Sequence, residues 1–140
     1  MELFILLLFG HLLGDYLFQN DWMARQKKEK LIPCMIHCII YTLTVFILLI
    51  PLLWHKHPFV SVAIIICIFL SHIILDATHL IDRWFRFTRG RSWTRLEAFR
   101  ANKDMEMEKI ARVVYTALVQ TVADNTIHLI LMYFLCYVLL

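Results

Sequence analysis

The chain has 140 residues, of which 61% are hydrophobic and 18% are charged. So apolar a composition excludes an ordinary soluble domain of this size and indicates a membrane protein. The formal net charge is +3, and the basic residues gather in two segments, residues 25–30 and 83–112. We therefore expect a protein that contacts membrane lipid, and we expect no nucleic-acid partner.

Four apolar stretches are predicted to be transmembrane helices: residues 2–18, 31–54, 59–81 and 117–140. The first is short, because a helix needs about 20 apolar residues to cross the hydrocarbon core. It begins MELFILLLFG, with an acidic start and no small-residue cleavage site, so we expect a retained span and not a signal peptide. The predicted fold is an all-α, four-helix membrane bundle that forms a single domain, residues 1–140.

Two basic links, residues 19–30 and 82–116, join these spans. The first is predicted to be a short interfacial helix, with Trp22 and Met23 at the lipid boundary. The second mixes arginines with aromatic residues, which suits an amphipathic segment on anionic headgroups. The positive-inside rule makes both links cytoplasmic. We therefore predict a multi-pass protein of the inner (plasma) membrane with both termini outside.

Ionisable residues recur in every predicted span, although an aspartate at a helix centre costs about 2.5–3.5 kcal/mol on insertion scales. Three i, i+4 pairs and two further histidines make up the set: His11–Asp15, His72–Asp76, Asp124–His128, His37 and His79. An i, i+4 spacing puts both side chains on one helix face. Counted from the cytoplasmic helix ends, all of them lie in the inner half of the membrane. We expect the bundle to gather them in one polar pocket open to the cytoplasm.

Imidazoles and carboxylates together favour a divalent transition metal, zinc first, with manganese or iron as alternatives. The eight residues are more than one tetrahedral ion needs, so two ions bridged by Asp76 are one interpretation, beside a single ion. Two ions about 3.5–4 Å apart are the usual machinery for hydrolysing phosphate esters. The predicted catalytic residues are His37, Asp76 and Asp124, with His37 as an acid or base toward a metal-bound hydroxide.

Six more residues are predicted to contact substrate or to support the ligands: Gln19, Trp22, Lys27, Lys28, Tyr41 and Asn125. The two lysines would draw in an anionic substrate, either soluble or lipid-linked. Other roles stay open at this stage. Asp–His pairs also lock helices together by hydrogen bonding, and His37 has such a bond to Asp15 or Tyr41 as its alternative. The four cysteines are interpreted as small buried hydrophobes, with metal ligation by Cys34 or Cys38 a minor option.

The segments HLLGDYLFQNDWMARQK, HCIIY, SHIILDATH and ADNTIH resemble a family of small bacterial and phage membrane proteins grouped as domain of unknown function 3307. The specific part is H-x-x-x-D-[FY]-x-x-Q-x-x-W, followed by H-x-x-x-Y, H-x-x-x-D and D-x-x-x-H. Asn125 stands where the family usually has glutamine. The resemblance implies no reaction. A more distant likeness to zinc-dependent phospholipase C, P1-type nucleases and inner-membrane metal-dependent hydrolases implies a metal held by bundled helices.

The sequence thus favours a membrane-embedded, metal-dependent hydrolase of a phosphoester or phospholipid-like substrate, reached from the cytoplasm. A proton or divalent-metal transporter or channel component is the first alternative, although the outer halves of the spans are almost purely apolar. A non-catalytic membrane interaction protein is the second. Self-association into a homo-oligomer stays open.

Overall fold

The computed structural model describes residues 1–78, 80–89 and 107–140. The described residues form α-helices and one π-helical turn and include no strand, which confirms the all-α prediction. The chain divides into two compact units. Unit 1 is Met1–Thr78 together with His128–Leu140, and unit 2 is His79–Ile127. Each unit is described by itself below.

Three helices are long and apolar enough to cross a membrane, which fits the predicted membrane protein. They are α3 (Leu31–Leu53), α4 (Pro58–Ala77) and α7 (Met107–Leu139). They correspond to the second, third and fourth predicted spans. α4 ends four residues earlier than predicted, because Thr78 adopts an extended backbone with φ −105° and ψ 149°.

The predicted first span is shorter than these three helices. α1 covers Glu2–Leu12, and one π-helical turn, η1, continues it over Leu13–Leu17. Together they fall short of the roughly 20 residues that a perpendicular crossing needs. A π turn inserts one extra residue into a helix and is frequent at functional sites. Here the π turn contains Asp15, one of the predicted ligands.

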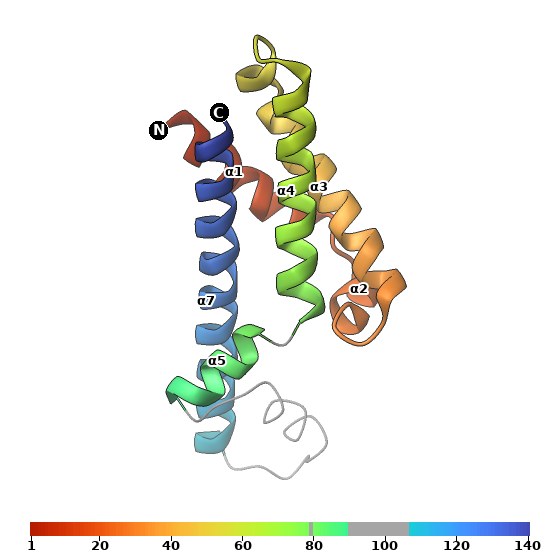
Figure 1. Cartoon of the computed structure of the whole chain (residues 1–140). Coiled ribbons are helices and arrows are strands. Elements are labelled where there is room, and N and C mark those ends of the chain that lie inside the picture. The colour runs from red at the N-terminus through yellow and green to blue at the C-terminus, as the bar shows by residue number, and fades with distance from the viewer. Residues whose placement is uncertain (79, 90–106) are drawn as a thin grey trace. The chain divides into compact units, whose positions relative to one another are not determined.

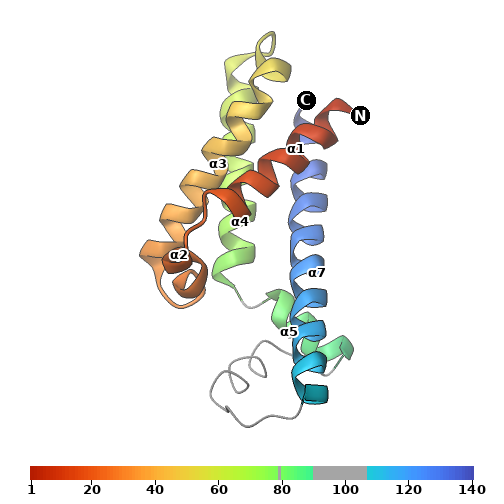
Figure 2. The same ribbon diagram turned by 180° about the vertical axis from the view of Figure 1, so that it is seen from behind.

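α1 crosses α3 obliquely in unit 1 (Figures 1 and 2). Two glycines allow the close approach. A Cβ on Gly10 would lie 3.1 Å from Cα of Val45, and one on Gly14 would lie 2.6 Å from Cδ2 of Tyr41. A G-x-x-x-G spacing is typical of close helix contacts in membranes, because only small residues let two backbones approach. The crossing places η1 beside the middle of α3.

The apolar core of unit 1 is built by α1, α3, α4 and the last part of α7. Its buried members are Leu7, Tyr41, Val45, Leu49, Leu53, Ile64, Ile68, Met132 and Cys136. On α3 and α4 these residues recur every four positions, so each helix buries one stripe. Pro58 begins α4, one residue before the predicted start of the span, because the first helical turn needs no N–H from that position.

The short helix α2, Asp21–Gln26, lies at the end of unit 1 opposite both chain termini and the α3–α4 connection (Figures 1 and 2). The Asn20 side chain caps it by accepting a hydrogen bond from the Met23 N–H at 2.9 Å. Trp22 is 43% exposed, but Met23 is only 7% exposed. The prediction that Met23 faces the lipid boundary is therefore wrong, because its side chain packs into the protein and anchors this helix.

Unit 2 contains α5 (Leu80–Arg89) and the part of α7 that precedes His128. Trp84 and Phe87 of α5 are exposed, with ring centroids 6.4 Å apart. Exposed aromatic rings are typical of helices at a membrane surface, and the interfacial position of α5 stays a prediction. His79 and residues 90–106 of the basic link lie outside the described residues.

Candidate metal centre

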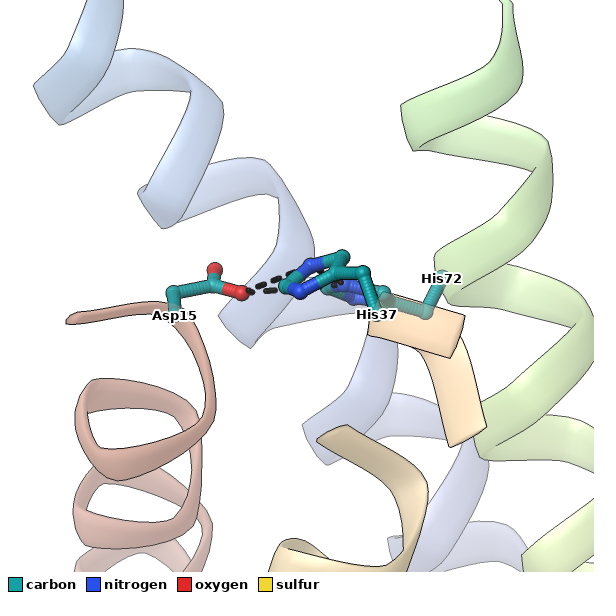
Figure 3. Close-up of side chains that lie close together, drawn as sticks. All are labelled: Asp15, His37 and His72. Atoms are coloured by element: carbon teal, nitrogen blue, oxygen red, sulfur yellow. Dashed lines mark hydrogen bonds and ion pairs between the residues drawn. The ribbon is translucent and has the colours of Figure 1, made fainter. Parts of the chain in front are cut away.

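Asp15, His37 and His72 meet inside unit 1, although they come from η1, α3 and α4 (Figure 3). Nε2 of His37 lies 3.2 Å from Oδ1 of Asp15 and 2.9 Å from Nε2 of His72. Nε2 of His72 lies 3.7 Å from the same Asp15 oxygen. Three segments that are far apart in the sequence thus direct ligand atoms at one point, within 4.8 Å of one another.

Asp76 on α4 joins the same group. Its Oδ2 lies 3.1 Å from Nε2 of His37 and 3.4 Å from Nε2 of His72. Its Oδ1 lies 3.6 Å from Nε2 of His128. A buried carboxylate is costly unless it is paired, and this one, 2% exposed, faces three imidazoles. We call the four side chains Asp15, His37, His72 and Asp76 the centre.

The spacing of the four atoms of the centre fits a metal ion. Zinc binds imidazole nitrogen and carboxylate oxygen at about 2.0–2.2 Å, so ligand atoms at the corners of a tetrahedron lie about 3.3–3.6 Å apart. Nε2 of His37 and Nε2 of His72 lie 2.9–3.7 Å from each other and from one oxygen of each carboxylate, and these five distances bracket that range. The two imidazoles therefore lie near metal-bound spacing with either carboxylate, and the group could hold a metal ion.

Hydrogen bonds between the imidazoles and the carboxylates account for only some of the close contacts in the centre. Each Nε2 atom carries at most one proton, so the two histidines can donate at most two hydrogen bonds from these atoms, whereas there are five close contacts among the four atoms. Oδ1 of Asp15 is buried, and it makes no hydrogen bond within the described part of the chain. A cation between these atoms would use the lone pairs that two protons cannot serve.

His11 and Tyr41 support the centre from one side. The Tyr41 ring stacks on His72 with centroids 3.6 Å apart and planes 13° apart, which fixes the imidazole's orientation. The Tyr41 hydroxyl lies 2.8 Å from Nδ1 of His11 and donates to the Met132 sulfur at 3.5 Å. Nδ1 of His11 lies 3.5 Å from Oδ2 of Asp15. The predicted ligand His11 thus contacts the second oxygen of Asp15 and lies next to the four atoms of the centre.

Lys27 brings a positive charge to the centre from the end of α2. Its ammonium donates to Oδ2 of Asp76 at 2.8 Å and to Oε1 of Gln19 at 3.1 Å, and it lies 3.4 Å from Nε2 of His37. The Lys27 side chain is 13% exposed. The sequence predicts that Lys27 draws in an anionic substrate. In the structure its ammonium points inward and contacts the centre directly.

The remaining predicted residues are His128 next to the centre, two residues at α2, two residues of unit 2, and His79. The His128 ring lies 4.6 Å from the His72 ring and 5.9 Å from the His11 ring, both between centroids. Asp124 and Asn125 lie on the part of α7 that belongs to unit 2, where the Asn125 amide donates to the Thr121 carbonyl at 2.9 Å. Trp22 and Lys28 lie on and just after α2, and His79 is outside the described residues.

Cys38 is a possible ligand that the sequence interpretation ranked low. Its sulfur and ligand atoms of His72 and Asp76 all lie within 4.8 Å of one another. It also lies 4.0 Å from the Cys34 sulfur. Its signals in the sequence are the position directly after His37 and the one-turn spacing from Cys34, and both concern α3 alone. Spacing along one helix therefore could not place it beside residues of α4.

The fold and the centre define a helical, membrane-type protein with a buried histidine–aspartate group that can hold a metal ion. Within that class, the chain belongs to the family described as Protein of unknown function (DUF3307), whose model matches residues 3–139. This confirms the resemblance carried by the H-x-x-x-D and H-x-x-x-Y motifs. No curated protein and no solved structure matches the chain. The more distant likeness to metal-dependent hydrolases therefore gains no support from these comparisons.

Proposed function

We propose that this protein is a membrane-embedded, metal-dependent hydrolase that acts on a phosphoester or phospholipid-like substrate from the cytoplasmic side. The observation that carries the proposal is that two imidazoles, His37 and His72, lie 2.9–3.7 Å from each other and from one oxygen each of Asp15 and Asp76, on three separate elements. Two imidazoles and two carboxylates favour zinc, with manganese or iron as alternatives. Such an ion, when bound, activates water and polarises a phosphoryl oxygen.

The proposal assigns one ion to the centre and gives its neighbours supporting roles. Asp15, His37, His72 and Asp76 hold the ion. His128 contacts the second oxygen of Asp76 and is the histidine best placed to accept or return a proton. This moves the acid–base role predicted for His37 to a residue that is not among the four ligands.

Charge favours an anionic substrate. The two carboxylates of the centre carry a formal charge of −2 when the histidines are neutral, and a divalent ion would balance it. The Lys27 side chain beside the centre would then leave an excess of one positive charge, whether or not its ammonium still contacts Asp76. Because the centre is largely buried, that excess is poorly screened and attracts a phosphoryl group strongly.

A groove on α3 supports a substrate with a hydrocarbon chain. It has a volume of about 410 Å³ and is lined by Leu13, Phe18, Ile40, Leu43, Thr44, Ile47 and Leu48. Leu43 and Ile47 are more than half exposed, on a helix apolar enough to lie in lipid. Leu13 lies two residues before Asp15 and Ile40 three after His37, so the groove is lined by two of the elements that carry the centre. A lipid-linked phosphoester could place its chain here and its headgroup at the centre.

The apolar core argues against transport. Beyond Tyr41, unit 1 is filled by Leu49, Ile64, Ile68 and Cys136, which offer no ligand series for an ion to follow.

The arrangement of unit 1 also supports the predicted topology. Both termini and the α3–α4 connection lie at one end, and the basic α2 segment lies at the other, as four spans with cytoplasmic links require (Figures 1 and 2).

The test combines metal analysis with hydrolysis by protein purified in mild detergent. We expect close to one zinc, manganese or iron per chain, and hydrolysis of a nitrophenyl phosphodiester that bears a long acyl chain in preference to its short-chain analogue. Chelation should abolish both, and the metal should restore both. His72→Ala should lose metal and activity, whereas His55→Ala, at an exposed position, should keep them. Bound metal without hydrolysis of either ester, or metal flux into liposomes, would overturn the hydrolase proposal.

A further inference from the structure

Lys27 contacts two of the four atoms that the proposed metal would use. Its ammonium lies 2.8 Å from Oδ2 of Asp76 and 3.4 Å from Nε2 of His37. A divalent ion bound to those atoms would draw on the same lone pairs and would lie next to the ammonium. Two cations so close repel each other strongly in a site of low dielectric constant. The metal and the Lys27 ammonium therefore compete for one carboxylate.

We propose that Lys27 is a displaceable counter-ion of the centre: its ammonium compensates Asp76 until a divalent metal binds, and metal binding releases it. This inference rests on the metal centre of the proposed function. It goes beyond that function because it gives Lys27 a role in metal affinity. The sequence analysis predicts only that Lys27 attracts substrate.

The attachment of Lys27 suits such a role. Its backbone is fixed, because its N–H donates to the Met23 carbonyl at 2.9 Å and Met23 is buried. Its side chain has four flexible carbons and a compact charge, so the ammonium can move several ångströms without any change in the helix. Gln19 accepts from the ammonium at 3.1 Å and holds it against Asp76. A fixed base and a flexible arm allow release without unfolding.

The surroundings explain why a counter-ion is needed. The side chains of Asp15 and Asp76 are 12% and 2% exposed, and an uncompensated buried carboxylate is strongly destabilising. A contrasting pair lies two residues away, where Arg25 contacts Asp21 at 3.5 Å and both side chains are largely exposed. Such surface pairs contribute little to stability. Of these two pairs, the buried Lys27–Asp76 pair is the one that holds charge in the site that the metal would enter.

The first measurement compares zinc affinities. Chelator-treated wild type, Lys27→Met and Lys30→Met are titrated with Zn²⁺ against a chromogenic chelator in detergent. Lys27→Met should bind zinc at least about tenfold more tightly than wild type, because no ion pair has to be broken. Lys30→Met should match wild type, because Lys30 is exposed. An equal or weaker affinity of Lys27→Met would overturn the inference.

The second measurement needs no variant, which matters if removal of the counter-ion unfolds the chelator-treated protein. Wild type is treated briefly with a water-soluble acylating reagent, and modification of each lysine is measured by mass spectrometry. Zinc should raise the rate at Lys27 severalfold and leave Lys30 unchanged. Zinc binding with no change at Lys27 would refute the counter-ion role alone. Failure of zinc to bind either wild type or Lys27→Met would refute the metal centre, and the counter-ion role with it.

Discussion

Two layers of unit 1 are equally buried but chemically opposite. Along α4, Ile64, Ile68, His72 and Asp76 form one stripe of every fourth residue, and each is at most 2% exposed. The first two belong to the apolar core and the last two to the centre. Burial therefore stays the same along this face of α4, while the side chains change from aliphatic to ionisable.

The apolar layer shows what packing alone requires. Aliphatic side chains hold α3, α4 and α7 together there through van der Waals contacts. Replacing buried ion pairs by well-packed apolar residues is often neutral or stabilising, so the centre is not needed to hold the helices. Ionisable residues that cost free energy in lipid are expected at functional sites. The contrast between the layers therefore favours a functional centre.

The largest expected effect comes from changing one residue in each layer, one turn apart on α4. His72→Ala should weaken metal binding by more than about 100-fold, above the 10–100-fold effect typical of outer-shell changes. Ile68→Ala should lower the free energy of unfolding by about 2–4 kcal/mol and leave the metal content unchanged. Elemental analysis gives the first quantity, and denaturation in detergent gives the second.

This pair also has a clear contrary outcome. If His72→Ala retained its metal, the four-atom centre would be wrong. If Ile68→Ala lost metal as completely as His72→Ala, the two layers would not be separable, and the centre would depend on overall packing and not on its own ligands.

The long helices were predictable from the sequence because their signals are local. Apolar runs of spanning length mark α3, α4 and α7, and the i, i+4 spacing of His72 and Asp76 puts both on one face. Partners on different helices were predictable only in part. Similar depths in the membrane indicated that Asp15, His37 and His72 would meet, but not which atoms would face one another.

What the sequence did not show depends on contacts between distant segments. The oblique crossing of α1 is made possible by Gly14 against Tyr41, a fit between residues 27 positions apart. The inward reach of Lys27 depends on a long, flexible side chain that joins the end of α2 to α4. The only sequence feature that hints at this contact is the cluster of basic residues after Trp22. Ordinary cytoplasmic links that follow the positive-inside rule have the same feature.

The two glycines of α1 give a second way to separate the layers. Gly14→Ala would place a Cβ 2.6 Å from Cδ2 of Tyr41, so the ring that stacks on His72 must move. We expect metal affinity to fall about tenfold. Gly10→Ala would place a Cβ 3.1 Å from the Val45 backbone, in the apolar layer. We expect it to cost about 1–3 kcal/mol in stability, with metal affinity near wild type.

Zinc titration and thermal unfolding of both glycine variants check this prediction. Equal losses of metal affinity would mean that both glycines act only by holding α1 against α3. Loss of affinity in Gly10→Ala alone would contradict the placement of Gly14 beside the centre.

The smallest effect is expected where the two layers meet, at Tyr41, which belongs to the apolar core and also stacks on His72. Tyr41→Phe keeps that stacked ring but removes the hydroxyl that lies 2.8 Å from Nδ1 of His11. His11 then loses one of the contacts that hold it against Asp15, so zinc affinity should fall only a few-fold, less than for a removed ligand. Tyr41→Leu removes the ring as well and should lower affinity further. If Phe and Leu gave equal losses, the hydroxyl and not the stacked ring would be what orients the centre.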